Sequence, residues 1–214
     1  MCIRDRKDIY YLLKVEKEEV FSNLVRLIAS QTGMIVNYAE LSSTLGISYR
    51  TLRSYLWYLE KTFILDKVTP FFKNTRKEIT KSPVFYFIDL GMRNFANGSF
   101  DWGGVQNADF VFQNFIYNIL SDKLKEKMAK INFWRTKDGA EVDFVVLVGS
   151  EEFPIEVKNR HLEKVEGNRS LMSYIEKYHP KKAIVVNLSL QGQKKVKGTQ
   201  LIAIPYWFDF TKIF

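Results

Sequence analysis

The chain has 214 residues, of which 46% are hydrophobic and 15% aromatic, enough for one large domain or two small ones with packed cores. Its formal net charge of +8 favours a polyanionic partner, with nucleic acid ahead of an anionic membrane surface. The only cysteine, Cys2, excludes a disulfide framework and a cysteine metal site, and no apolar run approaches the roughly 18 residues of a membrane span. We therefore expect a cytoplasmic protein that does not enter a membrane.

The first half of the chain predicts a helix-turn-helix. Apolar residues recur at helical spacing from Val15 to Thr32, which predicts a first helix. A short helix over residues 38–45, a turn at Gly46 and a longer helix with Ser48 as its N-cap should follow. Two helices joined by a short glycine turn form a helix-turn-helix.

Basic residues lie where such a module would meet nucleic acid. Arg50 and Arg53 project near the start of the second helix, the end that contacts base edges in DNA readers. Two strands, "FILDKVTPFF" and "SPVFYFID", then flank "KNTRKEITK", the pattern of a β-wing, whose Lys73, Arg76 and Lys77 suit phosphate contacts. We expect nucleic acid, double-stranded DNA first, as the partner. The alternative is a packing or subunit-contact module with a solvated basic turn.

A boundary is predicted near residue 100, because "NFANGSFDWGGVQN" replaces periodic apolar residues with glycine, asparagine and aspartate. We expect a winged helix-turn-helix domain at residues 7–100 and a second domain at 101–214. The first six residues, "MCIRDR", read poorly as a domain start and are expected to be non-native.

The second domain is predicted to be α/β, which makes the chain α+β overall with a mixed central sheet. A helix over residues 107–127 precedes the strands "INFWRTK", "AEVDFVVLV" and "FPIEVK". A helix near residues 165–178 and the strands "KKAIVVNLS" and "QLIAIPYWF" follow, with the polar "QGQKKVKG" as a loop between those strands.

Carboxylates interrupt two of these strands. Asp143 and Glu156 converge if their strands form a hairpin that turns at residues 149–152. Converging carboxylates repel unless a cation lies between them, and Mg²⁺ or Mn²⁺ accepts such oxygens. A metal-bound water is a nucleophile at neutral pH, and Lys158, on the same face as Glu156, can orient it or hold a phosphate. The pattern predicts a phosphodiesterase, with a salt-bridged structural cluster involving Lys158 or Arg135 as the alternative.

The Asp, Glu-x-Lys pattern on a hairpin resembles the PD-(D/E)XK nuclease-like fold. Five segments in order, "TGMIVNYAELSSTLGIS", "TLRSYLWYLEKTFIL", "YFIDLGMRN", "FWRTKDGAEVDFVV" and "PIEVK", resemble the C-terminal portion of prokaryotic AAA-type ATPases that carry domain of unknown function 4143. The resemblance, from Lys7 to about Leu188, implies a winged helix and a nuclease-like domain that follow an ATPase domain. No Gly-x-x-x-x-Gly-Lys-Ser/Thr loop is present, so we expect a fragment without ATPase activity, separated from its ATPase domain.

In this resemblance Asp143, Glu156 and Lys158 match the nuclease-like core, while Arg135 and Glu141 match its Trp-Arg and Glu-Val-Asp segments. Arg135 is thereby a candidate contact to nucleic acid.

The preceding helix departs from the family pattern. That helix usually brings a glutamate in a Phe-Glu-Asn context, where this chain has Gln113. An amide gives a neutral oxygen, so metal affinity should fall. A catalytically inactive module that positions the missing ATPase on nucleic acid or on a protein partner therefore stays open beside the nuclease, as do subunit packing and oligomer formation.

Overall fold

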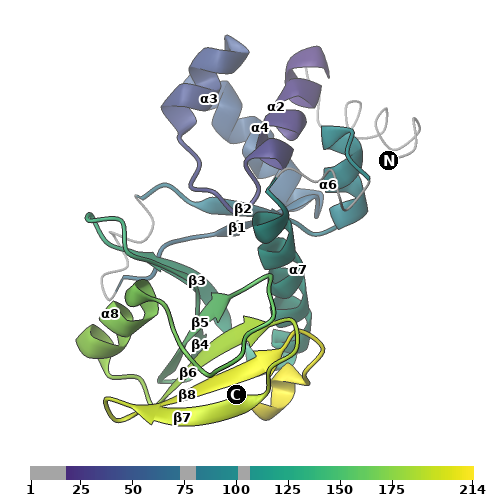
Figure 1. The fold of residues 1–214 in the computed structure, drawn as a ribbon. Coiled ribbons are helices and arrows are strands. Elements are labelled where there is room, and N and C mark those ends of the chain that lie inside the picture. The colour runs from purple at the N-terminus through teal and green to yellow at the C-terminus, as the bar shows by residue number, and fades with distance from the viewer. Residues whose placement is uncertain (1–17, 73–80, 101–106) are drawn as a thin grey trace. The chain divides into compact units, whose positions relative to one another are not determined.

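The computed structural model describes residues 18–72, 81–100 and 107–214, and the chain forms two compact units (Figure 1). The first unit comprises the described residues up to Lys67 and those from Ser82 to Asn114; the second comprises the rest. Helix α7 (Ala108–Lys123) begins in the first unit and ends in the second. The boundary predicted between residues 100 and 101 adjoins residues 101–106, which lie outside the described part.

Helices of the first unit begin and end at capping residues. Asn37 accepts hydrogen bonds from two backbone N–H groups of the helix it precedes, Gly46 ends that helix with a φ of 62°, and Ser48 caps the next helix. These caps confirm the predicted pair of helices and the turn between them. The helices are α2 (Glu18–Ser30), α3 (Tyr38–Leu45), α4 (Tyr49–Lys61) and α6 (Leu90–Asn97).

A small sheet lies beside these helices. Strands β1 (Leu65–Val68) and β2 (Val84–Phe87) pair, as predicted, and Ile35 adds an antiparallel bridge to Val84. Fully buried side chains from the helices and from β2 form one core, which includes Leu24, Leu52, Leu59 and Phe87. Residues 73–80, which contain most of the predicted wing, lie outside the described residues.

Helix α6 was not predicted. Asp89 caps it by accepting hydrogen bonds from the backbone N–H groups of Gly91 and Met92. Its Arg93 is fully buried and donates to the Ala29 carbonyl near the C-terminal end of α2, at 3.0 Å. The segment predicted to be a linker therefore starts inside a packed helix.

The second unit contains a mixed sheet, as predicted, and its six strands have the order β3-β4-β5-β6-β8-β7 (Figure 1). Strands β3, β4 and β5 are antiparallel neighbours, whereas β5, β6 and β8 run parallel. The strands are β3 (Lys130–Arg135), β4 (Glu141–Val148), β5 (Glu151–Val157), β6 (Lys182–Asn187), β7 (Gly192–Val196) and β8 (Thr199–Pro205).

Strand β7 corrects the prediction of a polar loop. It is one of the two edge strands of the sheet and runs antiparallel to β8. It shows no apolar alternation, because its central Gln193, Lys194 and Lys195 are all exposed. Lysines on an edge strand oppose pairing with another sheet, which explains a strand of this composition.

Helices cover both faces of this sheet. On one face α8 (Arg169–Tyr178) packs against Val145 and Val185. On the other face Phe144 contacts Tyr117 of α7, with ring centroids 6.0 Å apart. Short 3₁₀ helices, η2 (Lys125–Lys127) and η3 (Phe210–Lys212), follow α7 and β8. Within the described ranges, every helix is too short or too polar to cross a membrane.

Candidate functional site

Asp143 lies at a β-bulge in strand β4. The register of β4 with β3 shifts between Asn132 and Trp134, so that Asp143 and Phe144 together face the single residue Phe133. A bulge increases the local twist of a strand and re-aims its side chains, and bulges are common beside active sites. The bulge, rather than simple alternation, therefore sets the direction of the Asp143 side chain.

The β4–β5 ladder ends beside Asp143. Backbone pairing stops at Phe144 and Ile155, and one more step in the same register would place Asp143 opposite Glu156. Instead, Oδ2 of Asp143 accepts a hydrogen bond from the backbone N–H of Val157 at 2.7 Å. The carboxylate thus binds a backbone donor where the two strands separate, and it lies close to Glu156.

Glu156 is buried, with 3% of its surface exposed. Its Oε1 accepts two hydrogen bonds of 2.5 Å, one from Nζ of Lys158 and one from Nδ2 of Asn168. Its Oε2 is also buried but has no hydrogen-bond partner among the described residues. An unsatisfied buried carboxylate oxygen is costly, so this atom is the one most available to a ligand.

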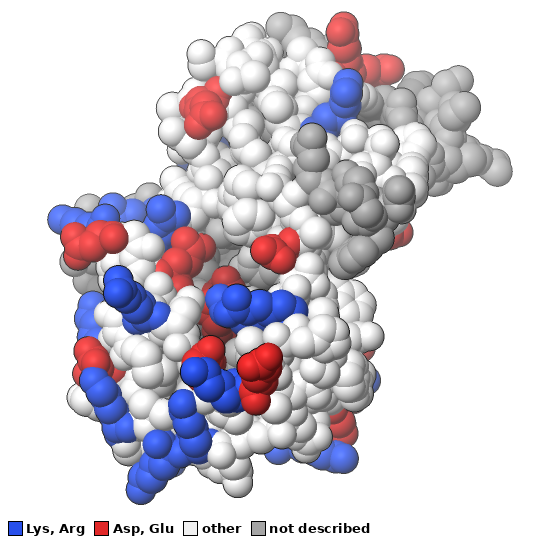
Figure 2. All heavy atoms as spheres, in the orientation of Figure 1, with Lys and Arg blue, Asp and Glu red and all other residues white. Residues whose placement is uncertain are grey.

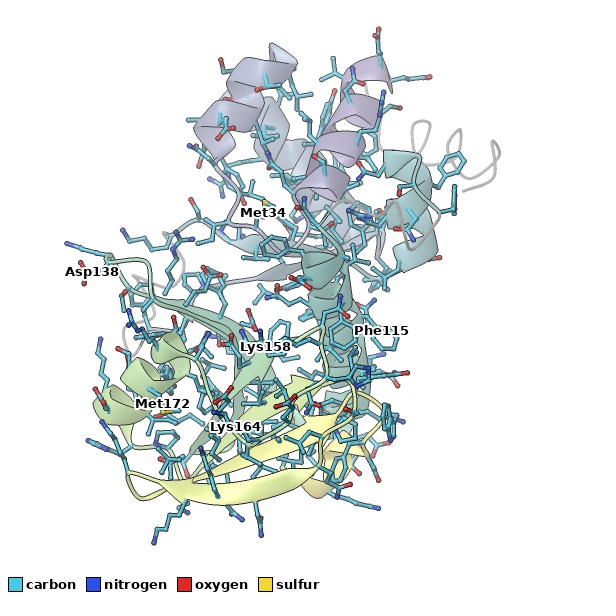
Figure 3. The ribbon with its side chains drawn as sticks, viewed as in Figure 1. Met34, Phe115, Asp138, Lys158, Lys164 and Met172 are labelled. Atoms are coloured by element: carbon cyan, nitrogen blue, oxygen red, sulfur yellow. The ribbon has the colours of Figure 1, made fainter. Side chains whose placement is uncertain are left out.

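Lys158 follows the end of β5, in the central part of the second unit (Figure 3). Its side chain is 27% exposed, and its backbone N–H donates to the Val186 carbonyl of the neighbouring strand. The backbone of Lys158 is therefore fixed to the neighbouring strand, while its ammonium pairs with Glu156 and remains partly exposed to solvent. The structure brings together the three predicted residues Asp143, Glu156 and Lys158.

Burial perturbs both carboxylates. It raises the pKa of Asp143 well above its usual range, and the charge of Glu156 raises that pKa further, against the lowering effects of the Val157 N–H and of Lys158. Burial also raises the pKa of Glu156, opposed mainly by Lys158. Two negative charges in one desolvated place destabilise each other, and a bound cation would relieve that repulsion.

These residues fit a divalent cation held by two carboxylates. Asp143 and Oε2 of Glu156 offer the hard oxygen ligands that Mg²⁺ and Mn²⁺ prefer, and Mg²⁺ is commonly bound by only one or two carboxylates together with water and phosphate oxygens. No group of three or more His, Cys, Asp and Glu side chains that could hold a metal occurs in the described part of the chain. The other ligands would therefore have to come from solvent, backbone or substrate.

Arg135 is the register partner of Glu141, and the two form an ion pair at 3.2 Å. Burial raises the pKa of Glu141, while Arg135 lowers it. The Arg135 side chain is 46% exposed, so it stays accessible although it is paired.

Gln113 belongs to the first unit, in α7. It is buried, and its Nε2 donates to the Tyr86 hydroxyl at 3.0 Å. These contacts lie within that unit, whereas Asp143, Glu156 and Lys158 belong to the second.

The predicted contacts to nucleic acid fall into two groups. Arg50 and Arg53 are exposed near the N-terminal end of α4, as the helix-turn-helix prediction requires. The wing residues Lys73, Arg76 and Lys77 lie outside the described residues.

Asn168, the second donor to Glu156, was not among the predicted site residues. Asn168 is the N-cap of α8 and accepts a hydrogen bond from the Leu171 N–H at 2.8 Å. An asparagine before an amphipathic stretch is a signal for a helix start. The predicted helix began near residue 165, which placed Asn168 inside it and concealed this role.

Proteins similar to this chain were found among curated sequences. An uncharacterized protein of Mycobacterium tuberculosis is 26% identical over 135 residues, which cover 62% of this chain and 30% of that protein. An uncharacterized protein of Haemophilus influenzae is 21% identical over 205 residues, or 94% of this chain and 48% of that protein. The chain thus spans less than half the length of these relatives.

Among solved structures, the crystal structure of a protein from Vibrio cholerae covers 79% of this chain and 47% of its own. It is 14% identical, with a TM-score of 0.26.

Two family models match successive parts of the chain. Residues 6–102 match a domain of unknown function, DUF8612. Residues 108–207, which include the carboxylate pair and Lys158, match the domain of unknown function DUF4143. This match confirms the predicted resemblance for the part of the chain that contains "FWRTKDGAEVDFVV" and "PIEVK", whereas the other three segments lie in the part that matches DUF8612.

Proposed function

We propose that the second unit hydrolyses phosphodiester bonds of nucleic acid with the help of a divalent cation. The observation that carries this proposal is the buried Oε2 of Glu156, without a partner and close to the carboxylate of Asp143. A structural salt bridge alone would leave no reason for that desolvated oxygen, whereas a cation would satisfy it.

Each residue has a distinct role in this proposal. Asp143 and Glu156 would hold the cation, and the Val157 N–H orients Asp143. The bound cation would supply a Lewis acid for a phosphoryl oxygen. Lys158 Nζ has three donors, so it can bind a substrate phosphate as a point charge. Its partial exposure gives the phosphate access.

We propose further that the first unit is a winged helix that contacts DNA. Its order of α2, the Ile35 bridge, α3, α4, β1 and β2 supports that reading, as do the exposed Arg50 and Arg53. On the visible face of the second unit, by contrast, basic and acidic side chains are interspersed (Figure 2). Within the described residues, the proposed DNA contact is assigned to Arg50 and Arg53 of α4.

A second candidate function is a catalytically inactive module that positions an ATPase on nucleic acid or on another protein. The neutral amide of Gln113, where the resembled family usually has a glutamate, favours this candidate. The greater length of the curated relatives leaves room for such an ATPase domain in the whole protein.

Cleavage of end-labelled DNA and RNA tests the first candidate. Purified protein would be incubated with each substrate in Mg²⁺ or Mn²⁺, and in EDTA. The variants are Glu156→Gln, which neutralises a proposed ligand, and Lys158→Met, which removes the ammonium. Lys164→Met is the matched control, because Lys164 lies in the same unit (Figure 3) and its one ion pair among the described residues is with the exposed Glu166.

The expected result is cation-dependent cleavage that Lys164→Met retains and the other two variants lose by a factor of about 100 or more. Absence of cleavage with either cation, together with DNA retention that weakens in salt, would replace the nuclease by the binding module.

A further inference from the structure

We infer that Asn168 is a positioning residue, which holds Oε1 of Glu156 so that Oε2 stays directed at the cation. This inference rests on the proposed cation site. It gives the N-cap residue of α8 a role in a site whose proposed cation ligands come from β4 and β5.

Both ends of the Asn168 side chain are engaged. Nδ2 donates to Oε1 of Glu156 at 2.5 Å, and Oδ1 accepts from the Leu171 N–H at 2.8 Å. Serine, threonine and aspartate can also cap a helix, but an ionised aspartate has no donor, and serine and threonine have a single hydroxyl on a shorter side chain for both tasks. Asparagine is therefore the residue that caps α8 and binds a carboxylate with one side chain.

Asn168 can hold the Glu156 carboxylate when Lys158 is engaged elsewhere, because both residues donate to the same oxygen. Oε1 is shared by Lys158 and Asn168, and both hydrogen bonds fix the rotation of the carboxylate. A movement of Lys158 toward a substrate phosphate would weaken its bond to Glu156. Asn168 then keeps the carboxylate in place, because its own bond is independent of the substrate. Partners of this kind around metal ligands affect metal affinity strongly.

A second hydrogen bond between α8 and β5 provides a matched control. The Tyr174 hydroxyl, two turns along the helix, donates to Oε2 of Glu152 at 3.1 Å. Tyr174 is fully buried and packs in the same core as Leu171. Tyr174→Phe therefore weakens the attachment of the helix to the strand without touching Glu156.

The test compares Mn²⁺ binding by the wild-type chain, Asn168→Ser and Tyr174→Phe, measured by titration calorimetry, with melting temperatures in EDTA. Serine keeps the helix cap and replaces the amide that donates to Glu156 by a hydroxyl on a shorter side chain. We expect Asn168→Ser to weaken Mn²⁺ binding by roughly tenfold or more. It should also lower the melting temperature in EDTA, because it removes a hydrogen bond to a buried carboxylate. Tyr174→Phe should lower the melting temperature and leave the Mn²⁺ dissociation constant unchanged.

The outcomes separate this inference from the proposed function. Equal Mn²⁺ affinity in the wild type and in Asn168→Ser overturns the positioning role but leaves the cation site intact. Equal weakening in Asn168→Ser and Tyr174→Phe also overturns it, because helix attachment alone would then explain the effect. A wild-type chain that binds no Mn²⁺ overturns the proposed cation site, and the inference with it.

Discussion

The carboxylate of Asp143 accepts a hydrogen bond from the backbone N–H of Val157, 14 residues away, at 2.7 Å. The Asp143 side chain thereby accepts a hydrogen bond from a backbone N–H of β5 beyond the last backbone pair between β4 and β5. The bond needs only an oxygen acceptor, so an amide can replace the carboxylate there. The negative charge of Asp143 strengthens this bond, but burial and the charge of Glu156 outweigh that effect, so the charge is destabilising in this place.

Asp143→Asn should therefore stabilise the cation-free chain at neutral pH. Folding raises the pKa of Asp143, so the folded state binds more protons than the unfolded state between the ordinary pKa and the raised one. Stability then falls as pH rises through that window, and the loss is complete above the raised pKa. The gain should be on the order of 1 kcal/mol for each unit by which the pKa is raised.

Urea unfolding in EDTA at neutral pH and below the ordinary pKa of aspartate measures this effect. The gain should vanish at the lower pH, where both states are protonated. If Asp143→Asn is less stable than the wild type at neutral pH, the Val157 N–H and Lys158 stabilise the charge of Asp143 by more than burial and Glu156 destabilise it, and the prediction is wrong.

Lys158→Met should destabilise the cation-free chain by about 1–3 kcal/mol, because it leaves Oε1 of Glu156 with Asn168 as its only donor. The partial exposure of Lys158 keeps this loss below that of a fully buried pair. The double variant Lys158→Met, Glu156→Gln should recover most of the loss. Additive effects of the two changes in urea unfolding would show that the pair is not coupled.

Local signals were enough to predict the helices around the turn at Gly46 and most strands of the sheet. Ser48 is followed by an amphipathic stretch, and β6 is a continuous apolar run, so each carries its own pattern. Helix α6 has no comparable signal, since it is short and contains glycine and two asparagines. It forms because Arg93 reaches the end of α2, a contact that sequence spacing does not show.

The candidate site was predictable in its residues but not in its geometry. Alternation along β5 placed Glu156 and Lys158 on one face, and the hairpin brought Asp143 near them. The bulge at Asp143 depends on register with β3, and the bond from Asn168 depends on where α8 begins. Both are tertiary consequences, so the partnerless oxygen of Glu156 could not be derived from the sequence.

Gly33→Ala should destabilise the first unit by about 1–3 kcal/mol. Gly33 has a φ of 79°, and a Cβ there would lie 2.8 Å from a ring carbon of Phe110. Left-handed backbone costs a residue with a Cβ roughly 1–2 kcal/mol, and the contact adds to that cost. Gly46→Ala is the matched control, because Gly46 has a similar φ of 62° but open space around its Cα. Equal losses in thermal unfolding would show that Phe110 moves without cost.

Arg50→Gln combined with Arg53→Gln should weaken binding to duplex DNA without changing the fold, because both side chains are exposed. If each arginine contacts one phosphate, the slope of log affinity against log salt concentration should decrease in magnitude by about 2, measured by fluorescence anisotropy. If net positive charge alone governed DNA binding, removing two charges anywhere on the surface would change the slope by the same amount. Lys194→Gln combined with Lys195→Gln removes the same charge from the edge strand β7 and supplies that comparison. A slope that falls equally in both double variants would assign the binding to net charge, and the role of α4 as a DNA-contacting helix would then be wrong.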